Sequence, residues 1–161
     1  MLVLGIDPGT ALIGYGLVAK EGSRLTAVTH GVIRTPAREE LALRLVQIHE
    51  QVKELVERYQ PDAVAVEELF FHKNVKTFSS VSQARGALIL TVAQSGIRVF
   101  EYTPLQVKQA VVGYGKAEKE QVQKMVKAIL KMDQIARPDD AADALAIAIC
   151  HIHSYRREVL L

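Results

Sequence analysis

The chain has 161 residues, of which 49% are hydrophobic and 24% charged, a composition typical of a globular domain with its own core. The longest apolar stretch, residues 144–150, is far shorter than the roughly 20 residues of a membrane-spanning helix, and the single cysteine excludes an intrachain disulfide. The net charge of +2 does not by itself indicate nucleic-acid binding, so any such function depends on where the charges lie.

The first predicted strand is the apolar run at the N-terminus, which ends at Asp7, directly before a Pro-Gly turn. An ionised carboxylate at the end of a buried strand costs several kcal/mol to desolvate unless a cation or hydrogen bonds compensate. Asp7 is therefore either a ligand-binding acid at the edge of a sheet or a residue that closes the turn. This segment alone leaves both interpretations open.

The next segments predict an antiparallel meander followed by a crossover. Residues 14–19 and 25–33 alternate as strands joined by a polar turn at residues 20–23, and three-and-four spacing then predicts a five-turn helix that Pro61 ends. Residues 63–66 form a short apolar strand that ends in Glu67. A right-handed crossover would place this strand parallel to the first, so that Asp7 and Glu67 meet at one edge of the sheet.

The second half of the chain predicts one more strand and four helices. A helix that ends at Ser95-Gly96 precedes a strand over residues 98–102, and Thr103-Pro104 is a typical helix start. A basic amphipathic helix follows, whose inner residues are expected to be Val122, Met125, Val126, Ile129 and Leu130. A buried final helix begins at Asp140 with Asp139 as its cap, and residues 155–161 are expected to be a frayed tail. The cysteine usage fits a cytoplasmic protein.

Four acids are expected to converge where these elements meet. Asp140 and Asp143 lie one turn apart on one face of the last helix; acids there can simply favour a helix N-terminus, but the apolar surroundings of Asp143 fit that explanation poorly. With Asp7 and Glu67 they form a set of like charges that needs a counter-charge, and the apolar stretches contain no Arg or Lys. Mg²⁺ prefers such oxygen ligands, and two ions about 4 Å apart can clamp a phosphodiester displacement.

Seven motifs spread in order over nearly the whole chain resemble those of the RuvC family of Holliday junction resolvases, in the ribonuclease H-like superfamily. They are Gly-Ile-Asp-Pro-Gly-Thr (5–10), Val-Glu-Glu-Leu-Phe (66–70), Gln-Ala-Arg-Gly (83–86), Phe-Glu-Tyr (100–102), Gln-Val-Lys-Gln (106–109), Ala-Glu-Lys (117–119) and Asp-Ala-Ala-Asp-Ala-Leu-Ala (140–146). The resemblance implies one nuclease domain over residues 1–154 with an α/β fold, in which a five-stranded mixed sheet, three antiparallel strands followed by parallel additions, is flanked by helices.

The resemblance also implies an activity. It indicates an Mg²⁺-dependent endodeoxyribonuclease that forms a homodimer and resolves four-way DNA junctions by paired symmetric nicks, in recombination and repair. Two Mg²⁺ ions per active site are expected, with Mn²⁺ as a substitute, and the implied partner is the branch-migration motor RuvA–RuvB. Asp7, Glu67, Asp140 and Asp143 match the family's catalytic, metal-binding acids; some members carry histidine where this chain has Asp140.

The resemblance further assigns DNA contacts. Lys108 and Lys119 match basic residues near the family's active site, and Phe70 matches an aromatic residue that contacts junction bases. Lys73 and Lys116 are added as DNA-binding candidates because they lie in basic segments beside these residues. Two simpler interpretations stay open: the lysines can form a solvated helix face, and one of the adjacent residues Phe70 and Phe71 can belong to the core.

Two other functions compete with the nuclease. An Asp-Pro-Gly-Thr turn after a first strand also suits the phosphate loop of actin-like sugar kinases and ATPases, but those proteins need two lobes and far more chain than 161 residues. A non-catalytic junction-binding module of the same fold is the second alternative, and the presence of all four acids argues against it.

Overall fold

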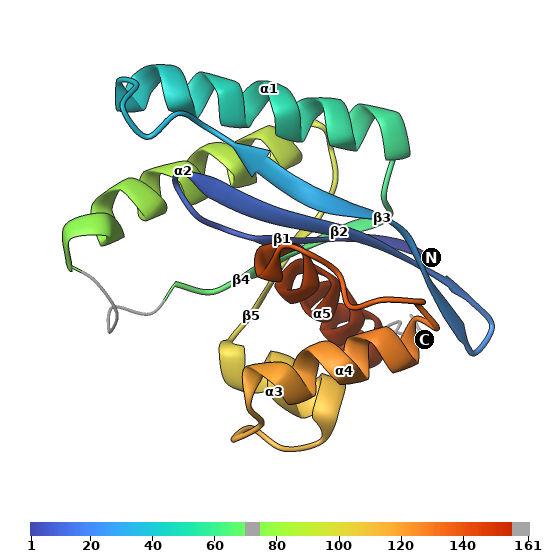
Figure 1. The fold of residues 1–161 in the computed structure, drawn as a ribbon. Coiled ribbons are helices and arrows are strands. Elements are labelled where there is room, and N and C mark those ends of the chain that lie inside the picture. The colour runs from blue at the N-terminus through green and yellow to red at the C-terminus, as the bar shows by residue number, and fades with distance from the viewer. Residues whose placement is uncertain (70–74, 156–161) are drawn as a thin grey trace.

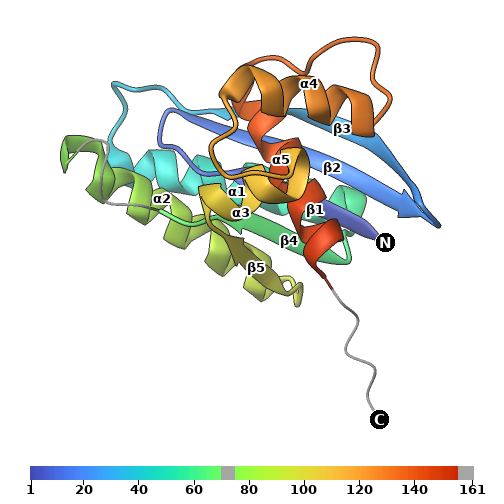
Figure 2. The same cartoon turned by 90° about the horizontal axis from the view of Figure 1, so that it is seen from below.

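The computed structural model describes residues 1–69 and 75–155 and shows a five-stranded sheet between two helical layers (Figure 1; Figure 2). The elements, in chain order, are β1 (Leu2–Asp7), β2 (Leu12–Glu21), β3 (Arg24–Arg34), α1 (Leu41–Tyr59), β4 (Ala63–Glu67), α2 (Val75–Gln94), β5 (Val99–Tyr102), α3 (Pro104–Val112), α4 (Lys119–Ile129) and α5 (Asp139–Ser154).

The strand order is β3-β2-β1-β4-β5, with β1, β2 and β3 antiparallel and β4 and β5 added in parallel. The predicted mixed sheet is thereby confirmed, including the crossover through α1 that brings β4 beside β1. In the register of these two strands Ile6 lies opposite Val66. The next residue of each strand is an acid, so Asp7 and Glu67 emerge at the same edge of the sheet.

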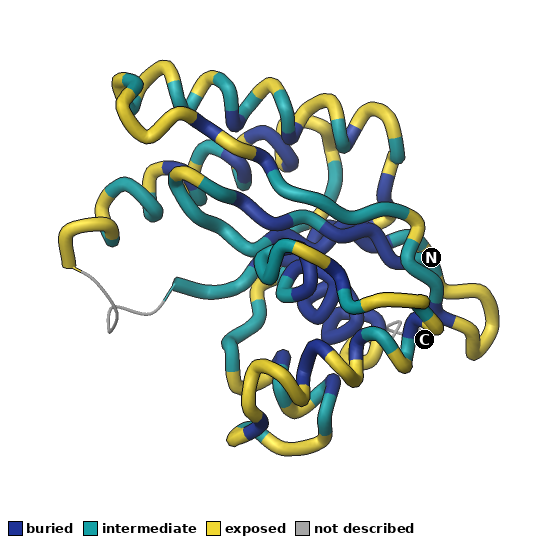
Figure 3. Tube along the Cα trace, viewed as in Figure 1, coloured by how far each residue is buried: buried dark blue, intermediate teal, exposed yellow. Residues whose placement is uncertain are grey.

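The helices α1 and α2 cover one face of the sheet, and α3, α4 and α5 lie on the other (Figure 1). The helix α5 crosses the middle of its face and is buried over most of its length (Figure 3). It approaches β1 closely at Gly5, where a Cβ atom would lie 2.0 Å from the carbonyl oxygen of Ala144. Because side chains of a strand alternate between faces, Asp7, two residues after Gly5, projects toward α5.

Some sequence predictions need correction. The turn between β2 and β3 is shorter than residues 20–23, because the charged pair Glu21 and Arg24 still pairs across the hairpin and Gly22, with a φ of 59°, makes the bend. Met125 is 37% exposed and is not an inner residue of α4. The buried face of this helix is narrow and consists of Val122, Gln123 and Val126. None of the described helices combines the length and hydropathy that crossing a bilayer requires.

A buried histidine on α5 predicts how stability depends on pH. His151 is fully buried, its Nδ1 lies 2.8 Å from the hydroxyl of Tyr102, and its Nε2 has no hydrogen-bond partner among the described residues. Burial lowers the pKa of His151 from 6.5 to about 4, so the folded protein keeps the ring neutral while the unfolded chain protonates it. Stability is therefore lost as the pH falls from the unfolded value toward the folded one.

We expect His151 to remove about 2–3 kcal/mol from the free energy of unfolding between pH 7 and pH 4.5. The variant His151→Phe keeps a ring in the same space but cannot titrate, so its loss over this range should be smaller by that amount. Urea unfolding of both proteins at the two pH values, at one protein concentration, measures the difference. An equal decrease in the unfolding free energy of both proteins would show that His151 is protonated in the folded protein as readily as in the unfolded chain.

Candidate active site

The four predicted acids come from three elements that meet at one edge of the sheet. Asp7 is the last residue of β1 and Glu67 the last residue of the neighbouring parallel strand β4. Asp140 and Asp143 lie near the N-terminus of α5, which packs against β1 and β2. A crossover and a helix packed across the sheet thus join residues more than 130 positions apart in the chain.

The pKa of Asp7 reflects the charges of the other three acids. Burial raises the pKa of the Asp7 carboxyl well above its ordinary value, and the charges of Glu67, Asp143 and Asp140 raise it further, in that order. The charge of Lys119 opposes them. The ionised form of Asp7 is therefore unfavourable here unless positive charge lies beside it.

Lys119, the first residue of α4, supplies part of that positive charge. Its Nζ lies 3.3 Å from Oδ2 of Asp143 and 3.4 Å from Oδ2 of Asp139. Burial lowers the pKa of the Lys119 ammonium, but the two carboxylates outweigh this effect and raise it overall. Burial dominates for Asp143, whose pKa stays raised even though Lys119 lowers it. This counter-charge comes from the first turn of the basic helix α4 and not from the apolar stretches, which contain no Arg or Lys.

Asp139 is not the cap of α5, as the sequence suggested. Pro138 occupies the cap position, and Asp139 is the first helical residue, with a carboxylate that accepts a hydrogen bond from the Arg137 guanidinium and pairs with Lys119. Two cations compete successfully with the backbone N–H groups for this carboxylate, because charge-assisted bonds are the stronger ones. Arg137, Asp139, Lys119 and Asp143 consequently form one chain of alternating charge.

A cavity of about 290 Å³ opens beside the acids. Glu67, Lys108, Lys119 and Asp143 line it together with the side chains of Pro104, Val107, Val122 and Ala146. Three larger cavities among the described residues, one of about 610 Å³ and two of about 520 Å³, are lined by none of the four acids. Because two of the four acids and two lysines line it, the 290 Å³ cavity is suited to a phosphate-bearing substrate with cations.

The donor set fits a hard divalent cation in chemistry, since all four side chains offer carboxylate oxygens. As the side chains lie, however, no three His, Cys, Asp or Glu residues within 1–69 and 75–155 are close enough to hold one metal ion between them. Like charges repel one another, and Lys119 holds Asp143 in an ion pair. Binding of an ion at this centre therefore requires the carboxylates to turn toward it.

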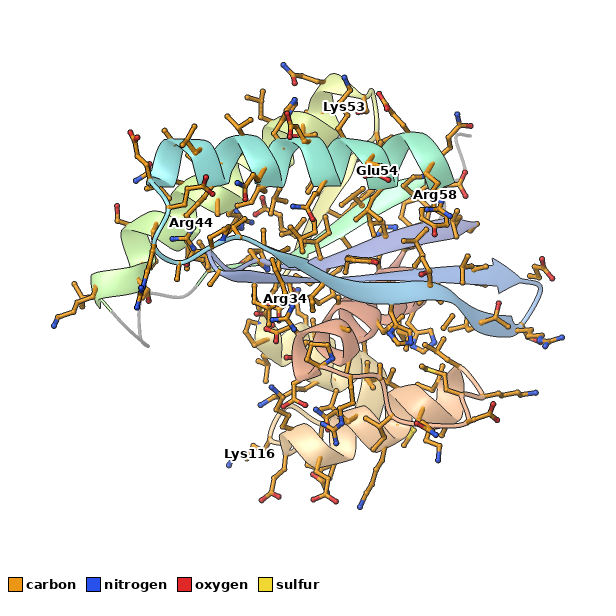
Figure 4. All side chains as sticks on the ribbon, turned by 45° about the horizontal axis from the view of Figure 1, so that its top comes forward. Arg34, Arg44, Lys53, Glu54, Arg58 and Lys116 are labelled. Carbon is orange, nitrogen blue, oxygen red and sulfur yellow. The ribbon has the colours of Figure 1, made fainter. Side chains whose placement is uncertain are left out.

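The other predicted DNA-binding residues fall into two groups. Lys108 lines the cavity with the acids, whereas Lys116 does not and is exposed at the outer edge of the helical layer (Figure 4). Phe70 and Lys73 lie outside the residues that the structure describes. The structure thus brings Lys108 and Lys119 to the acids and leaves Lys116 apart from them.

Gly14 of β2 is a residue of this site that the sequence analysis missed. It lies opposite Asp7, and a Cβ atom on it would be 2.0 Å from the carbonyl oxygen of Asp140 and 3.0 Å from the Cβ of that residue. The absence of a side chain therefore lets the start of α5 rest on the strand beside Asp7. The signal in the sequence was the pair of glycines at positions 14 and 16, which share one face of β2.

Comparisons with known proteins identify relatives of the whole chain. The family described as Crossover junction endodeoxyribonuclease RuvC matches residues 3–151. A protein of that name from Syntrophomonas wolfei subsp. wolfei is 62% identical over 156 residues, which cover 97% of this chain and 91% of the relative. Thermus thermophilus RuvC has a TM-score of 0.89 and 41% identity, and T. thermophilus RuvC in complex with Holliday junction substrate has 0.87 and 39%; both matches cover 95% of this chain and 94% of the other.

Proposed function

The chain belongs to the crossover junction endodeoxyribonuclease RuvC family, and from that premise we propose that it resolves four-way DNA junctions by paired symmetric nicks. The reaction depends on divalent metal ions, Mg²⁺ or Mn²⁺ and two per site, held by Asp7, Glu67, Asp140 and Asp143. The observation that carries the proposal is that three of these acids raise the pKa of the fourth at one sheet edge, beside a cavity with two lysines.

The residues of the site divide the work by their chemistry. Bound Mg²⁺ supplies Lewis-acid charge for the scissile phosphate and lowers the pKa of an attacking water. The four carboxylates fix the position of that charge relative to the sheet edge. The ammonium groups of Lys108 and Lys119 in the cavity favour the phosphate oxygens of the bound strand. Asp139, 3.4 Å from Lys119, keeps this ammonium at the cavity when Asp143 takes another cation.

A homodimer is part of the proposal because one chain carries one acidic centre, whereas resolution needs two nicks. A two-fold dimer presents two identical centres and matches a junction whose opposing strands are equivalent. Sedimentation of the protein with and without a junction measures this assembly. The branch-migration motor RuvA–RuvB is the proposed partner by resemblance to the family.

A synthetic four-way junction with labelled strands tests the function. In Mg²⁺ or Mn²⁺ we expect nicks at symmetric positions in two opposing strands, and in EDTA none; a linear duplex of the same sequence is the control. In Ca²⁺ we expect binding without cleavage, because Ca²⁺ takes a looser and longer coordination. Binding without cleavage in Mg²⁺ would indicate a non-catalytic junction-binding module, and ATP turnover an actin-like enzyme.

Lys119→Ala tests the contribution of the cavity lysines. We expect single-turnover cleavage to fall about 10–100-fold, since a positioned charge at the phosphate is lost, and the salt dependence of binding to become shallower by about one unit. Lys124→Ala is the matched control, because that lysine is an exposed residue of the same helix and pairs with Glu120 at 2.7 Å. Cleavage by Lys119→Ala at the wild-type rate would show that Lys119 is part of a solvated helix face and does not contribute to the reaction.

A further inference from the structure

Arg85 joins three elements beside the candidate active site. It lies on α2, and its Nε donates to the backbone carbonyl oxygen of Glu67 at 3.3 Å. Its Nη2 lies 3.0 Å from Oε1 of Glu101 on β5, and only 17% of the Arg85 side chain is exposed. One guanidinium group therefore contacts the last residue of β4 and a carboxylate of the neighbouring strand β5.

Glu67 lies at the end of β4, where the pairing of this strand within the sheet changes. The ladder between β1 and β4 ends at Ile6 and Val66, one residue before Glu67. On the other side Glu67 pairs with Tyr102, the last residue of the four-residue edge strand β5, and Glu68 donates to the Tyr102 carbonyl at 2.9 Å. A terminal rung on a short edge strand opens readily, so an additional contact on the carbonyl of Glu67 restricts its motion.

The geometry of the contact suits an arginine better than a lysine. A guanidinium group presents donors along a rigid planar fork, so it can hold a carbonyl on one edge and a carboxylate on another. Glu101, 45% exposed, fixes the orientation of that fork. An ion pair of this exposure adds little to global stability, so its main effect is local.

We propose that Arg85 is a positioning residue that holds the end of β4 so that Glu67 faces the other three carboxylates. This role rests on the proposed function, because the position of Glu67 matters only if it serves cleavage. Arg85 acts through the backbone of Glu67 and through Glu101, without touching the DNA.

Arg85→Ala tests the role by separating the rate from binding. At saturating junction we expect the single-turnover rate constant to fall about 10–100-fold, since small misplacements of catalytic groups have effects of this size. The dissociation constant of the junction in Ca²⁺ should stay within about twofold of wild type, because no charge at the DNA surface is removed. Arg85→Lys should recover part of the single-turnover rate constant. Glu101→Gln should lower this rate constant less than Arg85→Ala does.

A second measurement reports on position without any cleavage. Amide hydrogen exchange of residues 64–68 should become faster in Arg85→Ala, because the bond from Glu68 to Tyr102 opens more often. Arg58→Ala is the matched control, since Arg58 is an arginine on α1, stacked 5.4 Å from the Tyr59 ring (Figure 4). It should leave both exchange and cleavage unchanged.

Two outcomes would overturn the role of Arg85. A wild-type rate at saturating junction with unchanged exchange would show that Glu67 needs no such support. A loss found wholly in the dissociation constant would make Arg85 a DNA contact. If the wild-type protein cuts no junction, the proposed function fails instead, so the two failures are distinguishable.

Discussion

Asp7→Asn is expected to abolish junction cleavage while leaving the junction bound. The carboxylate of Asp7 lies at the centre of the acidic set, and losing several kcal/mol of metal-assisted stabilisation corresponds to a decrease of about 10³-fold or more. Binding should persist because it depends on cations that contact the phosphates, and this substitution removes none of them. Gel shifts in Ca²⁺ and cleavage in Mg²⁺ measure the two properties separately.

The same substitution should make the metal-free protein more stable. Burial and the other three acids raise the pKa of Asp7 in the fold, so the folded state holds a proton over a pH range in which the unfolded chain has lost it. Stability falls as the pH rises through this range, and at neutral pH the ionised carboxylate is a net cost. Asparagine has no charge to lose, so the melting temperature should rise by about 2–4 °C per kcal/mol regained.

Asp62→Asn is the matched control for both effects. Asp62 is an exposed acid before β4, at the other end of the sheet, and accepts a hydrogen bond from the amide of Leu2 at 2.6 Å. Its replacement should keep wild-type cleavage and should not raise the melting temperature. Cleavage by Asp7→Asn at a rate comparable to wild type would remove Asp7 from the proposed metal site.

Gly14→Ala is expected to impair both cleavage and stability. The added methyl group would lie 2.0 Å from the Asp140 carbonyl oxygen, so the start of α5 must shift away from β2. Overpacking of this kind costs about 1–3 kcal/mol of unfolding free energy. Displacement of Asp140 and Asp143 relative to Asp7 should reduce the cleavage rate by about 10²-fold. Urea unfolding and single-turnover cleavage measure the two losses.

Gly16→Ala separates displacement of the acids from loss of stability. Gly16 lies two residues farther along the same face of β2, and a Cβ on it would lie 2.7 Å from the side chain and 2.9 Å from the backbone nitrogen of Leu145. This variant should lose stability, yet it should cut faster than Gly14→Ala, because the clash is with Leu145, past the acids along α5, and not with Asp140 itself. Equal rates in the two variants would mean that the approach of Asp140 to β2 does not set the geometry of the site.

The edge of the sheet where the acids meet could be predicted because it follows from local patterns and one topological rule. Apolar runs that end in Asp7 and Glu67 identify two strand ends, and the intervening amphipathic helix makes those strands parallel neighbours. The spacing of Asp140 and Asp143 places them on one face of a helix whose apolar composition marks it as buried. None of these steps requires knowledge of how side chains pack.

The ion pairs of the site could not be predicted, because they depend on how helices pack on the sheet. Lys119 lies in a helix whose pattern indicates a solvated basic face, and its contact with Asp143 exists only because α4 packs beside α5. The contacts of Arg85 likewise depend on where α2 lies over β4 and β5. Assigning Asp139 as a cap followed a sound local preference, which the charges of Arg137 and Lys119 override.

The central claim is that divalent ions held by these carboxylates contact the phosphate that is cut. Cleavage of a junction with sulfur in place of one non-bridging oxygen at the mapped scissile phosphate tests it directly. Mg²⁺ prefers hard oxygen ligands, whereas Mn²⁺ also accepts sulfur, so we expect the substituted junction to be cut slowly in Mg²⁺ and to recover in Mn²⁺. Equal slowing of the substituted junction in both metals would contradict a contact between the ions and that phosphate.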